Sequence, residues 1–165
     1  MRVSYKWLKE YIDFTYSPDE LEHILTMAGM EVDEVEYLGA GIEDIIIGEI
    51  LKISEHPNAD KLVICEVDTG DEVLTIVTGA PNVFEGALVP VARVGVKLPD
   101  GMEIKKAKLR GEPSYGMMCS TDELGLSEER ASGIMILGED ARKGMKLIEY
   151  LNLDDHVFKL DLTPN

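Results

Sequence analysis

The sequence predicts an α+β protein in which a small five-stranded β-barrel is inserted into a small discontinuous α/β domain. Three observations lead to this prediction. The first forty residues carry helix signals and one strand, and the following hundred carry five short β-prone segments separated by turn residues. A last strand-like segment, 156–162, follows a predicted helix and has no other predicted strand next to it in the sequence. Because a strand is not stable alone, we expect it to pair with the N-terminal segment.

Two helices and a strand are expected before residue 40. Ser4 is a candidate N-cap for a helix over 5–12, and "SPDE" at 17–20 supplies an N-cap serine, a proline at the first helical position and a capping-box glutamate. Gly29 is placed to end the second helix in a left-handed cap. Residues 30–39 indicate an edge strand. We expect Trp7, Leu8 and Tyr11 on one face of the first helix, and Leu21, Ile24 and Leu25 facing inward from the second.

The five barrel segments are bounded by turn signals. Residues 45–56 form a long β-prone run in which Gly48 marks a bulge or bend, and residues 61–80 form a hairpin about "TGD". Residues 87–98 and 102–111 are expected to pair around "PDG", and 133–137 is the last short strand. This count of strands and hairpins fits an OB-fold. A helix is expected over 139–151, although Gly144 weakens it.

These elements predict three segments of domain organisation. Residues 1–39 form the first part of a split α/β domain, residues 40–151 form the inserted barrel, and residues 152–165 begin the second part of the split domain. The chain stops at "TPN", directly after the last strand. We therefore expect it to be a piece of a longer protein, with the split domain truncated.

Composition excludes several classes of protein. The 165 residues are 45% hydrophobic and 29% charged, as in an ordinary globular protein, and no apolar run approaches the roughly 20 residues that span a bilayer. The N-terminus lacks the apolar stretch of a signal peptide, so a cytoplasmic location and no membrane partner are expected. Cys65 and Cys119 have neither close spacing nor a nearby histidine, which favours buried thiols over a metal site or a disulfide.

A nucleophile is suggested by "SYGMMCSTDELGL" at 114–126, where Cys119 and Ser120 precede two acidic residues. Such a nucleophile needs a base within hydrogen-bond reach and an oxyanion hole. His56 is the histidine that could approach, but the sequence offers it no orienting partner. A buried thiol followed by a serine or threonine helix cap explains the stretch better, and a cysteine-dependent hydrolase is the weaker alternative. No phosphate-binding glycine loop is present in the sequence.

Charge is distributed unevenly along the chain. The net charge is −16, yet residues 97–110 hold five basic and two acidic residues, a local charge of +3. Charges beyond about 8 Å are largely screened at physiological salt, so a basic patch can act on an acidic protein. OB-folds bind nucleic acid with basic residues beside groups that contact bases. The basic segment and the "SYGMM" after it therefore favour nucleic-acid binding without sequence-specific readout.

Three segments in this order and spacing resemble the tRNA-binding domain shared by several aminoacyl-tRNA synthetases and free-standing tRNA-binding proteins. They are "HPNADKLVICEVDTG" at 56–70, "VTGAPNV" at 77–83 and "AKLRGEPSYGMMCS" at 107–120. The flanks "MRVSYKWLKEYIDF", "DELGL" and "DLTPN" are similar to the N-terminal part of the bacterial-type phenylalanyl-tRNA synthetase beta subunit. In that family the OB domain is inserted into a discontinuous N-terminal domain.

The resemblance implies a non-catalytic tRNA-binding module, with tRNA(Phe) as partner. The intact enzyme uses ATP and Mg²⁺ and pairs with an alpha subunit in an alpha2-beta2 heterotetramer, whereas this segment would hold no catalytic residue, cofactor or metal. By motif, the implied tRNA contacts are Lys108, Arg110, Ser114 and Met117, and the sequence adds Lys105, Lys106 and Lys61. Four residues are expected to shape loops, namely Asn58, Asp60, Asn82 and Gly116.

The charge of the barrel segment leaves a second hypothesis open. Residues 40–151 hold twelve basic and twenty acidic residues, a net charge of −8, which is more acidic than expected for a dedicated tRNA binder. On this alternative the segment is an assembly domain of the beta subunit with little tRNA affinity of its own.

Overall fold

The computed structural model describes residues 1–161 and shows two compact units. One combines residues 1–40 with the chain from Asn152 onward, and the other is Gly41–Leu151. Each has its own hydrophobic core. Residues 162–165, which include most of the "DLTPN" motif and the end of the predicted last strand, lie outside the described residues.

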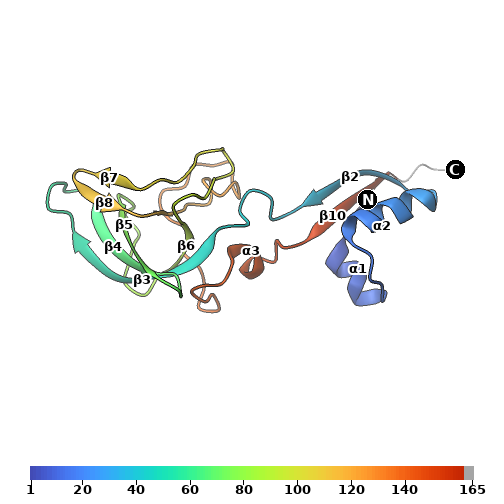
Figure 1. Ribbon diagram of the computed structural model, residues 1–165, viewed down its shortest axis with the longest axis horizontal. Helices are drawn as coiled ribbons and strands as arrows, with labels where there is room; N and C mark the ends of the chain where they lie inside the picture. The colour runs from blue at the N-terminus through green and yellow to red at the C-terminus, as the bar shows by residue number, and fades with distance from the viewer. Residues whose placement is uncertain (162–165) are drawn as a thin grey trace. The chain divides into compact units, whose positions relative to one another are not determined.

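The first unit is a three-stranded antiparallel sheet with two helices (Figure 1). Its strand order is β1 (Arg2–Ser4), β10 (His156–Asp161) and β2 (Glu31–Tyr37). The helices are α1 (Tyr5–Tyr11) and α2 (Pro18–Met27). The predicted pairing of the last strand with the N-terminal segment is confirmed, because β10 lies between β1 and β2. Phe158 of β10 is fully buried and packs with Leu21 and Leu160.

Both predicted N-caps are present. The hydroxyl of Ser4 accepts from the Trp7 N–H, and Ser17 and Glu20 form the reciprocal capping box at 3.2 and 2.8 Å. Gly29 has φ +91° and ends α2 as predicted. Trp7 and Tyr11 share one face of α1, as expected, since their ring centroids are 4.8 Å apart, and this face is exposed, at 52% and 70%. A seven-residue helix makes only two turns, and Leu8 is the side chain that reaches the core.

The prediction that Ile24 faces inward from α2 is wrong. This side chain is exposed, whereas Leu21 is buried and Leu25 packs beside it. The inward face of this helix is therefore narrower than the three predicted residues.

The second unit is a nearly closed, antiparallel, five-stranded barrel, as in an OB-fold (Figure 1). Its strand order is β5 (Val73–Thr78), β4 (Val63–Asp68), β3 (Ile46–Glu55), β6 (Leu88–Ala92) and β9 (Met117–Met118). The Tyr115 N–H donates to the Thr75 carbonyl at 2.8 Å and so links the two edges. A separate hairpin joins β7 (Ala107–Leu109) to β8 (Glu112–Ser114), and α3 (Leu147–Tyr150) follows.

Gly48 occupies a point of close approach inside the barrel. A Cβ atom there would lie 2.6 Å from Val67 Cγ1 and 2.8 Å from Val91 Cγ2. The register shift of β3 falls three residues later, between Ile50 and Lys52. The strand is therefore irregular as predicted. The bulge lies at Leu51, however, and Gly48 is needed because the buried side chains of Val67 and Val91 leave no room for a Cβ atom.

The predicted pairing of 87–98 with 102–111 is wrong over most of its length. A single bridge joins Lys97 to Glu103, while β6 pairs with β3 and β9 and β7 pairs with β8. Residues 133–137 form no strand, because the Met135 N–H donates to Cys119 and the Leu137 N–H donates to Leu88, on two different segments. β9 is the fifth barrel strand instead.

The predicted helix over 139–151 is reduced to the single turn of α3. Gly144 has φ +85°, and its backbone lies against Gly70 and the Thr69 carbonyl. A left-handed residue cannot continue a right-handed helix, so the segment before Leu147 is irregular.

Candidate nucleic-acid interface

The β7–β8 hairpin carries Lys108 and Arg110, and Lys105 and Lys106 directly precede it in the chain. Its turn is formed by Arg110, with φ +54°, and Gly111, with φ +92°, the two left-handed positions of a type I′ turn. Lys105, Lys106, Lys108 and Arg110 are all exposed, and none forms an ion pair within residues 1–161. Lys106 lies over the ring of Tyr115, with its Nζ 5.1 Å from the ring centroid. These charges are free to meet an anion.

A second loop is attached to the hairpin. His56 Nε2 bonds to the Leu109 carbonyl at 2.7 Å, and Asn58 Nδ2 donates to the Arg110 carbonyl at 3.3 Å. Lys61 follows in the same loop and is exposed. Asp60 is exposed too, and none of the side-chain hydrogen bonds of residues 1–161 involves it, which differs from the role in shaping this loop that the sequence predicts.

Ser114 and Gly116 shape the turn between the hairpin and β9. Ser114 is 4% exposed, and its hydroxyl accepts from the Val77 N–H at 3.0 Å and donates to the Gly116 carbonyl at 3.3 Å. Gly116 has φ +143°, and a Cβ atom there would lie 2.9 Å from the Ala92 carbonyl oxygen. The Ser114 hydroxyl is therefore used inside the barrel, and its predicted tRNA contact stays a prediction.

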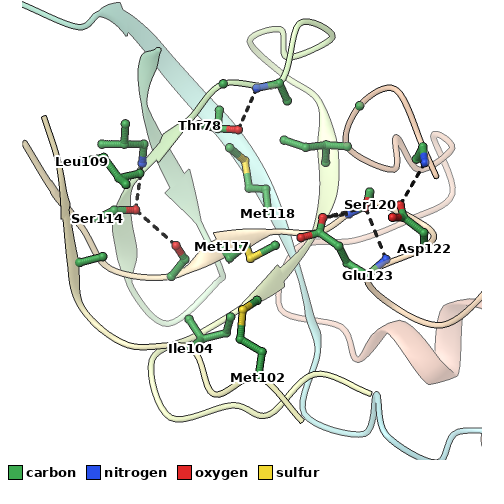
Figure 2. A pocket seen from close by; sticks show the side chains of 18 of the residues that line it. Thr78, Met102, Ile104, Leu109, Ser114, Met117, Met118, Ser120, Asp122 and Glu123 are labelled. Atoms are coloured by element: carbon green, nitrogen blue, oxygen red, sulfur yellow. Dashed lines mark hydrogen bonds between the residues drawn. The ribbon is translucent and has the colours of Figure 1, made fainter. Parts of the chain in front are cut away.

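A groove of about 800 Å³ lies beside these elements (Figure 2). Met102, Met117 and Met118 stand in its middle, with Ser114 on one side and Asp122 and Glu123 on the other. Met118 is buried, Met117 is half-buried and Met102 is 46% exposed. Lys105 and Arg130, both exposed, also line the groove. An apolar floor with basic residues at the rim suits a ligand that is both aromatic and anionic.

Asn82 holds one wall of this groove. Its Nδ2 donates to the Ile134 carbonyl at 2.7 Å, and its Oδ1 accepts from the Ile134 N–H at 3.0 Å. Gly133 allows this approach, because a Cβ atom there would lie 2.4 Å from Asn82 Oδ1. Ile134 belongs to the barrel core, so Asn82 fastens the loop before it to the barrel.

The acidic end of the groove is organised around Ser120. Its hydroxyl oxygen lies 2.6 Å from Asp122 Oδ1 and 2.7 Å from Glu123 Oε1, so the two carboxylates share its single proton, and its N–H donates to Glu123 Oε1 at 2.9 Å. The pKa of Asp122 is lowered mainly by the hydrogen bond from the Ser120 hydroxyl, and to a smaller extent by the hydrogen bond from the Ala131 N–H. The predicted helix after Ser120 is one capped turn, closed by the Leu124 N–H on the Ser120 carbonyl.

Cys119 is not arranged as a nucleophile. Burial, followed by the negative charge of Glu123, raises the pKa of its thiol to about 12, and burial raises the pKa of Cys65 to about 11. His56 is occupied, because Nδ1 accepts from the Asn58 N–H at 3.0 Å while Nε2 bonds to Leu109. Buried reduced thiols, as predicted, are what the structure shows.

Many of the residues that line the groove are not singled out by the sequence, among them Thr78, Met102 and Arg130. Arg130 follows two glutamates in a loop without periodicity, so its neighbours in sequence gave no sign of a binding role. The sequence indicates Met102 only as part of the expected strand 102–111 and gives it no binding role. Only the fold brings 102–105 and 130–134 to one groove.

Residues 1–161 contain neither a metal-binding cluster of side chains nor a membrane-spanning helix. No three His, Cys, Asp or Glu side chains within residues 1–161 are placed to hold a metal ion. In the same range, no helix is long and apolar enough to cross a membrane.

An OB-fold barrel with an exposed basic hairpin beside an apolar groove defines a nucleic-acid-binding module. The family model described as "Putative tRNA binding domain" matches residues 45–146, which include the barrel, the hairpin and the groove. The chain belongs to this tRNA-binding domain family.

Relatives with closely similar sequences are phenylalanine–tRNA ligase beta subunits. The subunit of Oleidesulfovibrio alaskensis is 50% identical over 165 residues, which are 100% of this chain and 20% of that relative. The subunit of Legionella pneumophila is 51% identical over 166 residues, covering 100% of this chain and 21% of the relative. The chain thus spans about a fifth of the length of the curated relatives it matches.

Among solved structures, the chain is similar to the crystal structure of a MetRS-related protein from Pyrococcus horikoshii. It is 20% identical, with a TM-score of 0.45, and the match covers 81% of this chain and 98% of that one.

Proposed function

We propose that this chain is a non-catalytic tRNA-binding module of a phenylalanine–tRNA ligase beta subunit, which assists the binding of tRNA(Phe) during aminoacylation. The observation that carries the proposal is the coincidence of the family match, 45–146, with a barrel edge whose exposed basic residues lack ion pairs within residues 1–161. The same match favours tRNA binding over the alternative of a purely structural assembly domain.

In this proposal the exposed cations bind tRNA phosphates. Lys105, Lys106, Lys108 and Arg110 supply the hairpin side, and Lys61 extends the charge onto the loop that His56 and Asn58 attach to it. Met117 lies in the adjoining groove, where it can meet a base. Ser114 acts by holding the turn before Met117, and a direct contact of Ser114 with tRNA is the finer part of the proposal.

The remaining parts of the proposal concern the intact enzyme. Its ATP and Mg²⁺ would be bound outside these residues, its partner would be an alpha subunit in an alpha2-beta2 assembly, and its location would be the cytoplasm. The relatives' names, which specify a ligase and a beta subunit, support the ligase activity and the alpha partner. We further propose domain boundaries at 39/40 and 151/152, close to the division of the compact units at 40/41 and 151/152.

The test is a fluorescence anisotropy titration of tRNA(Phe) with the 165-residue chain at several salt concentrations. Replacing Lys105, Lys106, Lys108 and Arg110 with Glu should abolish measurable binding or weaken it at least tenfold and flatten the salt dependence, because each lost phosphate contact lowers the slope by about one. The matched control replaces four other exposed basic residues with Glu, namely Lys6, Lys52, Arg142 and Lys146. Equal affinities for the two variants would overturn the proposal.

A further inference from the structure

The floor of the groove has properties that phosphate binding does not explain. It is formed by Met102, Ile104, Met117 and Met118, and Met102 leaves almost half of its surface open to solvent. Leu109, at 39% exposed, borders the same groove from β7. Exposed apolar surface gathered in a concave site on a charged protein marks a place where an apolar group binds.

The rim of the groove is charged, in contrast to its apolar floor. Lys105 and Arg130 approach it from segments 25 residues apart in sequence, and neither has an ion pair within residues 1–161. Three carboxylates also line it, those of Glu103, Asp122 and Glu123. Asp122 and Glu123 each already accept from Ser120 through one oxygen, Oδ1 and Oε1. The groove thus has an apolar floor and a rim of mixed charge, on which Lys105 and Arg130 are the cations, and the carboxylates of Asp122 and Glu123 stand at one end.

We propose that this groove takes an unpaired nucleotide, whose base lies on the methionine floor while its phosphate meets Lys105 or Arg130. The inference rests on the proposed function, since it names the part of an RNA that this site accepts. Sulfur makes favourable contacts with aromatic rings, and every base offers a π-face. Among the described residues no aromatic ring lines the groove, so the methionines are the groups on which a base can lie.

Unpaired RNA fits this arrangement better than duplex RNA. In a duplex the faces of the bases are covered by their neighbours, and a side chain reaches only edges, sugars and phosphates. A duplex can therefore contact the basic hairpin but not the floor of the groove. The carboxylates at the far end repel phosphate, whereas they can accept hydrogen bonds from the amino group of a base. The phosphate is accordingly placed at the rim and the base inside.

The experiment compares two RNAs on the 165-residue chain by fluorescence anisotropy. One is a labelled single-stranded 12-nucleotide RNA without self-complementarity, and the other is the same strand annealed to its complement. Met102→Ala removes the most exposed part of the floor without touching the barrel core. It should weaken binding of the single strand about two- to tenfold and leave binding of the duplex unchanged. Met102→Leu, which keeps the apolar surface, should lose less, and Met27→Ala in α2 is the control.

A second readout follows the methionine methyl groups by NMR in protein labelled at the methionine methyl carbons. Ring currents of a stacked base should shift the signals of Met102 and Met117 with the single strand and not with the duplex. Equal effects of Met102→Ala on both RNAs, or unshifted methyl signals with bound single strand, would overturn this inference while the proposed function stands. Binding of neither RNA would also overturn this inference, whereas the proposed function fails only if tRNA(Phe) itself binds the parent chain no more tightly than it binds the variant in which Lys105, Lys106, Lys108 and Arg110 are replaced with Glu.

Discussion

The imidazole Nε2 of His56 donates a hydrogen bond of 2.7 Å to the carbonyl oxygen of Leu109, 53 residues further along the chain. The donor role follows from the other nitrogen, because Nδ1 accepts from the Asn58 N–H at 3.0 Å and so carries no proton. The residue is buried, with 7% of its surface exposed. A single neutral histidine therefore holds the loop that carries Lys61 against the hairpin that carries Lys108 and Arg110.

Replacing this histidine should loosen the hairpin while the barrel persists. We expect His56→Ala to lower the free energy of unfolding by about 1–3 kcal/mol, because a buried hydrogen-bonded group is lost and the Asn58 N–H loses its acceptor. Hydrogen exchange should become faster in residues 107–114 and stay unchanged in the β4–β5 ladder. His23→Ala, at an exposed site on α2, is the control. Unchanged exchange in the hairpin would contradict this role.

Asn82 offers a test of the groove wall. Asn82→Ala removes both hydrogen bonds to Ile134 and leaves that N–H and carbonyl without partners, so unfolding should become easier by about 1–3 kcal/mol. Urea denaturation followed by circular dichroism measures the change. Ser132→Ala, exposed in the same loop, should stay within about 0.5 kcal/mol of the parent chain. A loss confined to Ser132→Ala would show that Asn82 does not hold the wall.

Gly48→Ala tests the close approach inside the barrel. Its Cβ would lie 2.6 and 2.8 Å from methyl groups of Val67 and Val91, both fully buried, so these side chains must move. Overpacking of this kind should cost about 1–3 kcal/mol, measured by urea denaturation. Lys52→Ala, on the exposed surface of the same strand, is the matched control. An unchanged midpoint for Gly48→Ala would contradict the packing.

The raised pKa values of the two buried thiols lead to one prediction about their alkylation and one about the pH dependence of stability. Burial raises the pKa of Cys65 from 9.0 to about 11, and burial with the charge of Glu123 raises the pKa of Cys119 from 9.0 to about 12. At pH 8 iodoacetamide should therefore alkylate the folded chain slowly and the urea-unfolded chain quickly. Rapid alkylation of the folded chain would revive the nucleophile hypothesis.

The sign of the pH effect follows from the same shifts. Because folding disfavours the thiolate, the thiol contribution to stability is complete below pH 9 and is lost as pH rises through about 11 to 12. Between pH 8 and 10.5 the parent chain should lose more stability than a variant with Cys65→Ala and Cys119→Ala. That comparison removes the effect of other groups that titrate in this range. Equal losses in the two chains would contradict the raised pKa values.

Features that depend on a few neighbouring residues were predictable from the sequence. The caps at Ser4 and Ser17 and the left-handed Gly29 are local, since each hydrogen bond or dihedral angle involves residues within one or two helical turns. The hairpin between β4 and β5 is local for the same reason. The partner predicted for 87–98 and the strand predicted at 133–137 are wrong, because β-propensity indicates that a segment can be extended but not which segment accepts its N–H groups.

The α+β class, the barrel, the pairing of the last strand with the N-terminal segment and the basic segment before "SYGMM" follow from local patterns in the sequence. The role of each side chain follows from the packing of distant segments. This packing buries Ser114 and Cys119, occupies both nitrogens of His56, and brings Met102 to the same groove as Arg130. The physical reason is that burial, hydrogen-bond partners and grooves depend on contacts between segments far apart in the chain, which local patterns do not encode.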